Sequence, residues 1–243
     1  MTAEQPPACR TGRRSGWRKW LGVPHTQTKR LIFYDLDGTL VDTKQDITAS
    51  ANHMLREIGL PPLSQEQVIP HVGRGLRQLV VSCIGSCSSE KLESAMKIYR
   101  RHYTEHMLDH SRLYPGVEEL LEHFKSRKQA VVTNKPNPYS RQILAGLGVE
   151  GYFMEIIGGD SEYPKKPDPA ALIALMEKAG ARPAEALFIG DSVVDIQAGK
   201  AAGIEMAVVT HGFESQEAIR AASPEVIALD FIELLALAKK WGW

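Results

Sequence analysis

Short apolar runs alternate with longer segments of mixed polarity over most of the chain beyond residue 30. Five such runs, most of them followed by polar residues or glycine, predict strands at residues 31–34, 130–133, 154–157, 186–189 and 206–209. Their nearly continuous apolar character is typical of strands that are buried on both faces. Helix-length segments occupy residues 117–127, 139–146, 169–179 and 194–202, and an apolar helix stripe covers residues 229–237. Strands that alternate with helices predict an α/β fold, doubly wound around a parallel sheet.

The interval between the first two predicted strands departs from this alternation. From about residue 47 to residue 113 no run resembles a strand, and helical spacing of apolar residues predicts helices at residues 47–58, 65–71, 75–83 and 90–108. So long a helical interval exceeds what a crossover between strands requires. We therefore expect residues 47–113 to form an inserted helical cap over the ligand-binding edge of the sheet, with residues 30–46 and 114–243 as the α/β core.

Composition places the chain among ordinary globular proteins. It has 243 residues, of which 43% are hydrophobic and 24% charged, so it can bury a sizeable core. The formal net charge of zero argues against nucleic acid as a partner, and no apolar run is long enough to cross a membrane. An odd number of cysteines, three, favours a reduced, cytoplasmic protein. The sequence leaves open whether the protein is a monomer or a homodimer.

The charge is distributed unevenly. Residues 1–30 carry seven basic residues against the single acid Glu4, so the rest of the chain is acidic. Residues 1–29 lack apolar periodicity, and we expect a flexible basic extension there. A signal peptide is not expected, because no apolar segment follows the arginines. Trp17 and Trp20 leave open a weak contact with a membrane surface or a partner, against the alternative of a solvated tail.

Chemically reactive residues come directly after the predicted strands or in the loops that follow them. These are Asp35, Asp37, Thr133, Asn134, Lys166, Asp191 and Asp195. The carboxyl ends of parallel strands meet at one edge of a sheet, so we expect the set to converge. Carboxylates hold hard cations such as Mg²⁺, and a lysine with a hydroxyl can hold phosphoryl oxygens. A carboxylate beside them can attack phosphorus and form an aspartyl-phosphate.

Asp35 and Asp37 form the most informative pair. They are two residues apart, so in an extended backbone both side chains point the same way. One can act as nucleophile while the other gives a proton to the leaving oxygen. Gly38 permits a sharp turn after them. The alternative interpretation of this segment is an Asp-Gly turn that merely ends a strand.

Four segments in order resemble the motifs of the haloacid dehalogenase superfamily. They are Phe-Tyr-Asp-Leu-Asp-Gly-Thr-Leu-Val-Asp at residues 33–42, Val-Val-Thr-Asn-Lys at 131–135, Lys-Pro-Asp-Pro at 166–169 and Gly-Asp-Ser-Val-Val-Asp at 190–195. Each motif is modest alone, but the four occur together with family-like spacing. The resemblance covers roughly residues 30–213 and implies a Rossmann-like core with a helical cap.

The resemblance also implies roles in catalysis and metal binding. Asp35 is expected to be the nucleophile and a Mg²⁺ ligand. Asp37 is expected to be the general acid and base, with its backbone carbonyl on the metal. Asp191 is expected to be the remaining metal ligand of the protein. Asp195 is expected to support the site by contacting the ligands and not the metal itself.

Phosphate binding is expected from Thr133 and Lys166, with Asn134 as an additional contact. An acid at position 37 favours phosphate ester chemistry over carbon–halogen cleavage, because relatives with other chemistry lack it. Strings such as Tyr-Pro-Gly-Val at residues 114–117 resemble the phosphoglycolate phosphatase subfamily. The expected activity is therefore hydrolysis of a small phosphorylated metabolite such as 2-phosphoglycolate. A phosphomutase or a pyrophosphatase is the alternative, and a non-catalytic regulatory protein would show a broken motif, which this chain does not.

Two features of the predicted cap bear on specificity. Arg74 lies between Gly73 and Gly75, and one hypothesis is that it meets a carboxylate or second anionic group on the substrate. The alternatives are an exposed arginine in a turn, or Arg77 in that role. Histidines at positions 102, 106 and 110 favour a solvated helix face over a metal stripe.

Overall fold

The strand that leads to Asp35 lies in the centre of the sheet and is completely buried. In the computed structural model, which describes residues 27–243, the side chains of β1 (Leu31–Tyr34) are inaccessible to solvent. Six parallel strands form the sheet in the order β5-β4-β1-β6-β7-β8. The other five are β4 (Lys128–Val132), β5 (Glu155–Ile157), β6 (Ala186–Gly190), β7 (Glu205–Val209) and β8 (Val226–Ala228). The predicted doubly wound parallel sheet is confirmed.

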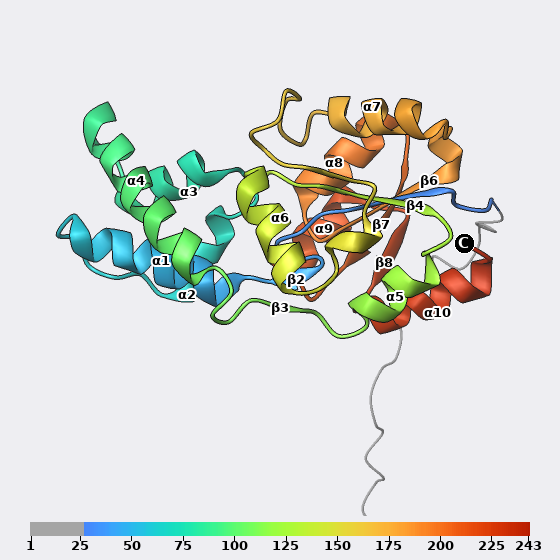
Figure 1. Ribbon diagram of the computed structural model, residues 1–243, viewed down its shortest axis with the longest axis horizontal. Helices are drawn as coiled ribbons and strands as arrows, with labels where there is room; N and C mark the ends of the chain where they lie inside the picture. The colour runs from blue at the N-terminus through green and yellow to red at the C-terminus, as the bar shows by residue number, and fades with distance from the viewer. Residues whose placement is uncertain (1–26) are drawn as a thin grey trace, which may run out of the picture.

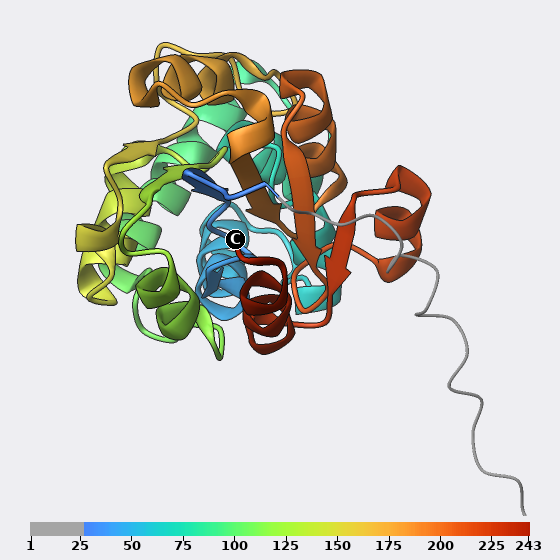
Figure 2. The ribbon, with the colours of Figure 1, turned by 90° about the vertical axis from the view of Figure 1, so that its right-hand side faces the viewer.

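Side chains along each strand point alternately to the two faces of the sheet, so the core consists of two apolar layers. Ile32 and Tyr34 pack with α5 (Val117–His123), α6 (Asn137–Gly146) and α10 (Phe231–Trp241) on one face. Leu31 and Phe33 pack with α7 (Ala170–Ala179), α8 (Val193–Ala202) and α9 (Gln216–Ala222) on the other face. Successive side chains of a strand point to opposite faces, so strands that are apolar throughout require a helical layer on each side. Figure 2 shows the sheet between its two layers.

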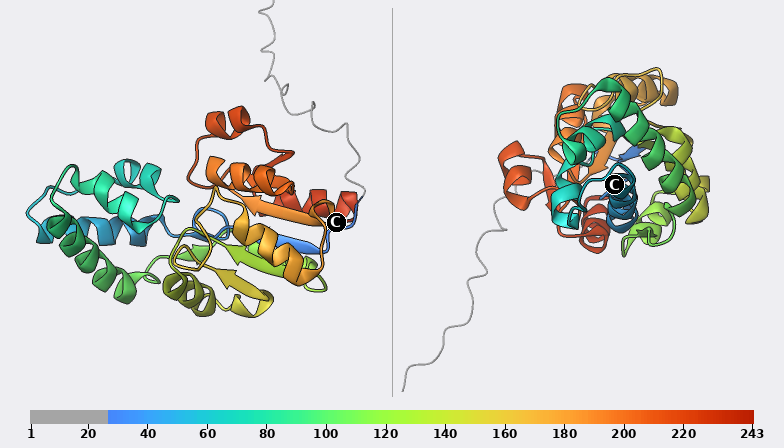
Figure 3. Two further views of the ribbon diagram at one scale, coloured as in Figure 1. Left: turned by 90° about the horizontal axis from the view of Figure 1, so that it is seen from above. Right: turned by 90° about the vertical axis from the view of Figure 1, so that its left-hand side faces the viewer.

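The expected helical cap is also confirmed, and it lies beside the sheet (Figures 1 and 3). It consists of α1 (Lys44–Glu57), α2 (Gln65–Val68), the short 3₁₀ helix η2 (Ile69–His71), α3 (Leu76–Ile84) and α4 (Ser89–His106). A two-stranded antiparallel ribbon of β2 (Val41–Asp42) and β3 (Arg112–Leu113) joins it to the core. The interval 47–113 was expected to lack strands, but it ends in strand β3. A strand of two residues is too short to be recognised from the sequence pattern. The exact division into core and cap residues stays a prediction.

A buried carboxylate fixes the base of the cap. Asp46, in the first turn of α1, accepts hydrogen bonds from the backbone N–H groups of His110 and Ser111 and from the Ser111 hydroxyl, at 2.7–3.1 Å. The start of the first cap helix is therefore tied to the segment that returns from the last one. A buried carboxylate persists only with such partners, so this contact defines where the cap meets the core.

Other differences from the predictions have local causes. Strand β8 and helix α9 are short and flank a Ser-Pro turn, so neither shows a clear period, and the sequence predicts neither. Helix α10 begins two residues later than predicted because the Asp230 side chain caps it, accepting a hydrogen bond from Glu233 N–H (2.8 Å). Two 3₁₀ turns, η3 (Glu150–Tyr152) and η4 (Pro183–Glu185), complete the core.

The end of the predicted basic extension packs against the core. Lys29 is buried, pairs with Glu205 (2.6 Å) and donates a hydrogen bond to the Ala184 carbonyl (3.0 Å). The predictions for residues 1–26 lie outside the described residues. Among the described helices, none has the length and apolar character needed to span a membrane.

Candidate active site

Asp35 stands at the carboxyl end of β1, facing a lysine from another loop. Its backbone N–H donates to the Ile189 carbonyl (3.0 Å), which continues the pairing of β1 with β6. The side chain is buried, and Lys166 Nζ lies 2.8 Å from Asp35 Oδ1. Burial raises the pKa of Asp35 to about 6, against the opposing attraction of Lys166 and with added repulsion from Asp195. The cost of burying this carboxylate therefore exceeds what the adjacent Lys166 ammonium offsets.

Lys166 is held by contacts on both its side chain and its backbone. Its Nζ bridges Asp35 and Asp195 (2.6 Å), and these carboxylates raise its pKa against the opposite effect of burial. The Asn134 side chain accepts from Lys166 N–H and donates to the Lys166 carbonyl, both at 2.9 Å. Its other N–H bonds to the Gly73 carbonyl of the cap (2.8 Å). The amide of Asn134 thus has no N–H left for a phosphoryl oxygen and instead joins the lysine loop to the cap.

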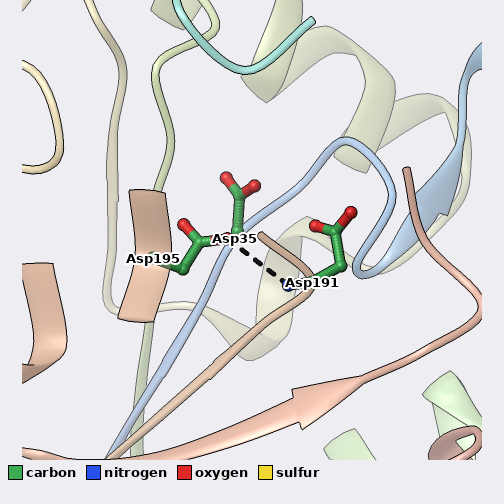
Figure 4. A group of neighbouring side chains, drawn as sticks. All are labelled: Asp35, Asp191 and Asp195. Carbon is green, nitrogen blue, oxygen red and sulfur yellow. Dashed lines mark hydrogen bonds between the residues drawn. The ribbon is translucent and has the colours of Figure 1, made fainter. Parts of the chain in front are cut away.

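Two further aspartates follow β6. Asp191 accepts hydrogen bonds from the Thr39 hydroxyl (2.7 Å) and from Phe213 N–H (2.8 Å). Asp195 is in the first turn of α8, where Ser192 caps the helix and donates its hydroxyl to Asp195 Oδ2 (2.6 Å). Figure 4 shows the two with Asp35, and its dashed line is the hydrogen bond from Asp191 N–H to Asp195 Oδ2 (3.3 Å).

The three carboxylates have the character of a metal site. Asp35, Asp191 and Asp195 each offer an oxygen within 4.8 Å of the others, and all three are buried. Burial, with repulsion from Asp195 and Asp35, raises the pKa of Asp191. Asp195 is already used by Lys166 and Ser192, whereas Asp35 Oδ1 receives no hydrogen bond among the described residues beyond the ion pair with Lys166. Hard cations favour such oxygen ligands, so the residues fit a metal ion held mainly by Asp35 and Asp191.

Asp37 lies beside a cation that the sequence analysis did not assign. Lys135 Nζ is 2.9 and 3.1 Å from the two carboxylate oxygens of Asp37, and the Thr43 hydroxyl donates to Asp37 Oδ1 (2.6 Å). Lys135 is buried, and its Nζ lies 4.6 Å from the centre of the Tyr103 ring. In the sequence, Lys135 could have been recognised as a site residue by its position two residues after Thr133, just beyond the end of a predicted strand.

Residues of the core and of the cap line a partly open cavity of about 60 Å³ at these residues. Asp35, Asp37, Lys135 and Lys166 line it from the core, as do Thr133, Asn134 and Asp195. The Thr133 hydroxyl oxygen accepts from Lys135 N–H (3.3 Å), which leaves its own O–H to donate. Apolar and aromatic residues of the cap, among them Val72, Leu76, Tyr99 and Tyr103, line the other side. The lysines and the hydroxyl on one side and the apolar residues on the other suit a small molecule with an anionic group.

The structure does not test the specificity role predicted for Arg74. Arg74 is exposed, and it is its neighbours Gly73 and Gly75 that line the cavity. Arg77, the competing candidate, pairs with Glu93 on the surface of the cap (2.8 Å). Lys165, next to Lys166, is exposed.

The histidines of the cap have partners of their own. His102 Nδ1 lies 3.0 Å from the Ser50 hydroxyl, and the His102 ring packs between His53 and His106 at centroid distances of 4.2 and 4.3 Å. His106 Nδ1 lies 2.8 Å from Asp109 Oδ2. Among the described residues, the group of acidic and histidine side chains arranged for a metal ion is the aspartate set above.

Gly212 provides a test of the metal site. A Cβ on Gly212 would lie 2.2–2.5 Å from side-chain atoms of Asp191, so Gly212→Ala must displace that carboxylate. We expect the variant to fold and to need a roughly 10- to 100-fold higher metal concentration for half-saturation. Calorimetric titration with Mg²⁺ or Mn²⁺ checks this.

Gly151→Ala is the matched control, because Gly151 has no atom within 4 Å of the added methyl group. An unchanged metal requirement in Gly212→Ala, with Gly151→Ala also unchanged, would contradict the assignment of Asp191 as a ligand.

Comparisons with known proteins agree with this geometry. The family model described as haloacid dehalogenase-like hydrolase matches residues 32–209. Phosphoglycolate phosphatase 1 of Pseudomonas aeruginosa is 37% identical over 222 residues, covering 88% of this chain and 81% of that protein. Phosphoglycolate phosphatase of Haemophilus influenzae is 37% identical over 88% of this chain and 99% of its own length. A crystal structure described as a predicted phosphoglycolate phosphatase from Haemophilus somnus superposes with a TM-score of 0.83 and 33% identity, over 86% of this chain and 98% of that one.

Proposed function

This chain belongs to the haloacid dehalogenase-like hydrolases and is a phosphatase, and we propose that its substrate is 2-phosphoglycolate. The observation that carries the proposal is the cavity between core and cap in which Asp35, Asp37, Thr133 and Lys166 meet. Acidic and basic groups of the core line one side of it and apolar groups of the cap the other, an arrangement that suits a small phosphate ester. Relatives that cover most of the chain bear the name of phosphoglycolate phosphatase, which supports this substrate over larger sugar phosphates.

In the proposed first step, Asp35 attacks the phosphorus atom. The bond between phosphorus and the ester oxygen breaks, and its electrons go to that oxygen, which takes a proton from the Asp37 carboxyl group. The product alcohol leaves, and the phosphoryl group stays on Asp35. Lys166 and the Thr133 hydroxyl are placed to neutralise and orient the phosphoryl oxygens.

In the second step, water attacks the phosphorus of the aspartyl-phosphate. Asp37, now a carboxylate, takes a proton from the water, and the bond between phosphorus and Asp35 breaks to restore the carboxylate and release phosphate. The apolar side chains of the cap limit the water that reaches this intermediate. Asp37 lies within reach of Thr43 and Lys135, which hold it for both proton transfers.

We assign the metal to Mg²⁺, held by the carboxylates of Asp35 and Asp191 and by the backbone carbonyl of Asp37. When bound, it supplies positive charge to a cluster of buried acids that Lys166 alone does not neutralise. Asp195 supports the site through Lys166 and the backbone of Asp191. A cytoplasmic location stays a prediction from the cysteine count, and the choice between monomer and homodimer stays open.

A phosphate-release assay over a panel of metabolites tests the substrate. We expect 2-phosphoglycolate to give a kcat/KM roughly 10- to 100-fold above glucose 6-phosphate, since one charge-assisted contact to a substrate carboxylate has an effect of that order. Activity should vanish with a chelator and return with Mg²⁺. Higher activity on sugar phosphates or pyrophosphate would refute the substrate, and a requirement for a sugar bisphosphate would favour a mutase.

A further inference from the structure

Lys135 has a binding capacity that its contact with Asp37 does not use up. It is buried, lines the cavity and approaches both carboxylate oxygens of Asp37 within 3.1 Å. An ammonium group has three N–H donors, and the two oxygens of Asp37 use at most two of them. The third donor is therefore available to a ligand in the cavity. The other lysine that lines the cavity, Lys166, is committed to Asp35 and Asp195.

The cap contributes a second polar group to this cavity, the hydroxyl of Tyr103. Tyr103, on α4, lines the same cavity, and its ring packs against the Lys135 ammonium. Its hydroxyl is buried and has no hydrogen-bond partner among the described residues. Buried polar groups in native proteins are nearly always satisfied, so a hydroxyl at this place points to a partner supplied by a ligand. A phenylalanine would serve equally well if the position only filled space.

The chemistry of the proposed reaction locates the ligand group. Asp37 must touch the ester oxygen of the substrate to give it a proton, and Lys135 is in contact with Asp37. In 2-phosphoglycolate a single methylene group separates that oxygen from the carboxylate. A carboxylate so close to the ester oxygen falls beside the same lysine, whereas the exposed Arg74 lies outside the cavity lining.

From this geometry we infer that Lys135 and the Tyr103 hydroxyl form a subsite for the carboxylate of the substrate. The inference rests on the proposed function, which it deepens by naming the residues that select a short carboxylated phosphate ester. Because Tyr103 belongs to the cap and Lys135 to the core, the subsite is complete only when both elements enclose the substrate. Charge-assisted bonds in a buried site are strong, so the pair supplies specificity as well as affinity.

The test compares two esters that differ only in the carboxylate, 2-phosphoglycolate and ethyl phosphate. The quantity measured is the ratio of their kcat/KM values, which cancels any general effect on Asp37. We expect Lys135→Met to lower this ratio roughly 10- to 100-fold and Tyr103→Phe to lower it roughly 3- to 10-fold. Tyr103→Phe removes an unpartnered hydroxyl, so it should fold at least as well as the wild type. Lys97, an exposed lysine of α4 outside the cavity lining, provides the control, Lys97→Met, with an unchanged ratio.

A binding measurement supplies a readout that needs no turnover. In 3-phosphonopropionate a methylene group replaces the ester oxygen of 2-phosphoglycolate, and propylphosphonate lacks the carboxylate. Calorimetry should show wild-type preference for the first and loss of that preference in Lys135→Met, with Mg²⁺ present throughout.

Three outcomes would overturn the inference, and they are distinguishable. A wild-type enzyme that does not prefer 2-phosphoglycolate to ethyl phosphate would refute the proposed function and the subsite together. Equal losses on both esters in Lys135→Met would leave the function standing and reduce Lys135 to a positioning residue for Asp37. A lost preference in Arg74→Ala, with the preference kept in Lys135→Met, would assign the carboxylate to the cap turn.

Discussion

Replacing Asp35 by asparagine is expected to lower kcat on any phosphate ester by at least about 10³-fold, while the protein folds normally. The amide has the size of the carboxylate but cannot attack phosphorus. Among residues 27–243 the neighbouring carboxylates are already engaged, Asp37 by Lys135 and Thr43, Asp191 by Thr39 and Phe213, and Asp195 by Lys166 and Ser192. Phosphate release from 2-phosphoglycolate measures the loss, and acid-quenched reactions with labelled substrate should trap a phosphoprotein in the wild type only.

The same substitution should stabilise the metal-free protein at neutral pH. Because burial raises the pKa of Asp35 to about 6, the folded state binds more protons than the unfolded state between about pH 4 and pH 6. The stability that Asp35 contributes is therefore fully present below the unfolded pKa and is lost as the pH rises through about 6. Above that pH the carboxylate costs on the order of 3 kcal/mol, a penalty that Asp35→Asn removes.

The two effects can be separated from misfolding by thermal unfolding in a chelator. The Asp35→Asn variant should unfold at a higher temperature than the wild type at pH 7, and the difference should shrink toward pH 4. Mg²⁺ should stabilise the wild type more than the variant. Turnover within about tenfold of the wild type would refute Asp35 as nucleophile, and a less stable variant at pH 7 would refute the electrostatic account.

The strands that carry the site could be predicted from the sequence, and the reason is physical. β1 and β6 are buried on both faces, so their apolar runs are uninterrupted and end at the reactive residues. The edge strand β8 and the ribbon strands β2 and β3 have two or three residues each, too few for any period. They form because neighbouring strands supply hydrogen-bond partners, which is information about tertiary structure and not about local sequence.

The candidate site was predictable where a residue type implies its chemistry. Asp35, Asp37, Lys166 and Asp191 converge as the strand ends predict. Contacts between distant segments were not predictable in this way. No spacing reveals that the Asn134 amide bonds to the cap and to the backbone of the Lys166 loop. The position of Lys135 beside Asp37 likewise depends on how two loops meet.

Hydrogen bonds of the Asn134 side chain connect the cap to the loop that carries Lys166. Its bonds to Gly73 and to Lys166 span residues that are 61 and 32 positions away in the chain. The cap turn and the lysine loop are therefore held by the same amide. A direct contact of Asn134 with phosphate stays a prediction.

Replacing Lys166 by methionine is the second change with a large expected effect. Its Nζ lies between two buried carboxylates, Asp35 at 2.8 Å and Asp195 at 2.6 Å. Removing the cation leaves both uncompensated, and breaking a buried pair in this way costs about 3–5 kcal/mol. We expect a loss of that order in the free energy of unfolding at pH 7 and a fall in kcat of roughly 10²- to 10³-fold. Denaturant titration and phosphate release measure the two losses.

The matched control for Lys166→Met is Lys165→Met, since Lys165 is its exposed neighbour. It should change neither stability nor turnover. Lowering the pH should narrow the stability gap between Lys166→Met and the wild type, because Asp35, whose pKa is raised by burial, takes up a proton. If the difference in the free energy of unfolding were constant from pH 5 to pH 8, the lost stability would be due to packing and not to charge.

The double variant Asp35→Asn, Lys166→Met identifies the cause of the destabilisation. If Lys166 stabilises the protein by neutralising buried carboxylates, removing the charge of Asp35 as well should recover part of the loss. Residues in direct contact show coupling of about 0.5–3 kcal/mol in double-mutant cycles, and we expect a value in that range here. The remaining deficit belongs to Asp195, which also loses its ion pair with Lys166 and keeps only the hydrogen bonds from Ser192 and Asp191 N–H. Strict additivity of the two single changes would contradict the ion-pair account, because it would mean that Asp35 and Lys166 act independently although 2.8 Å separates them.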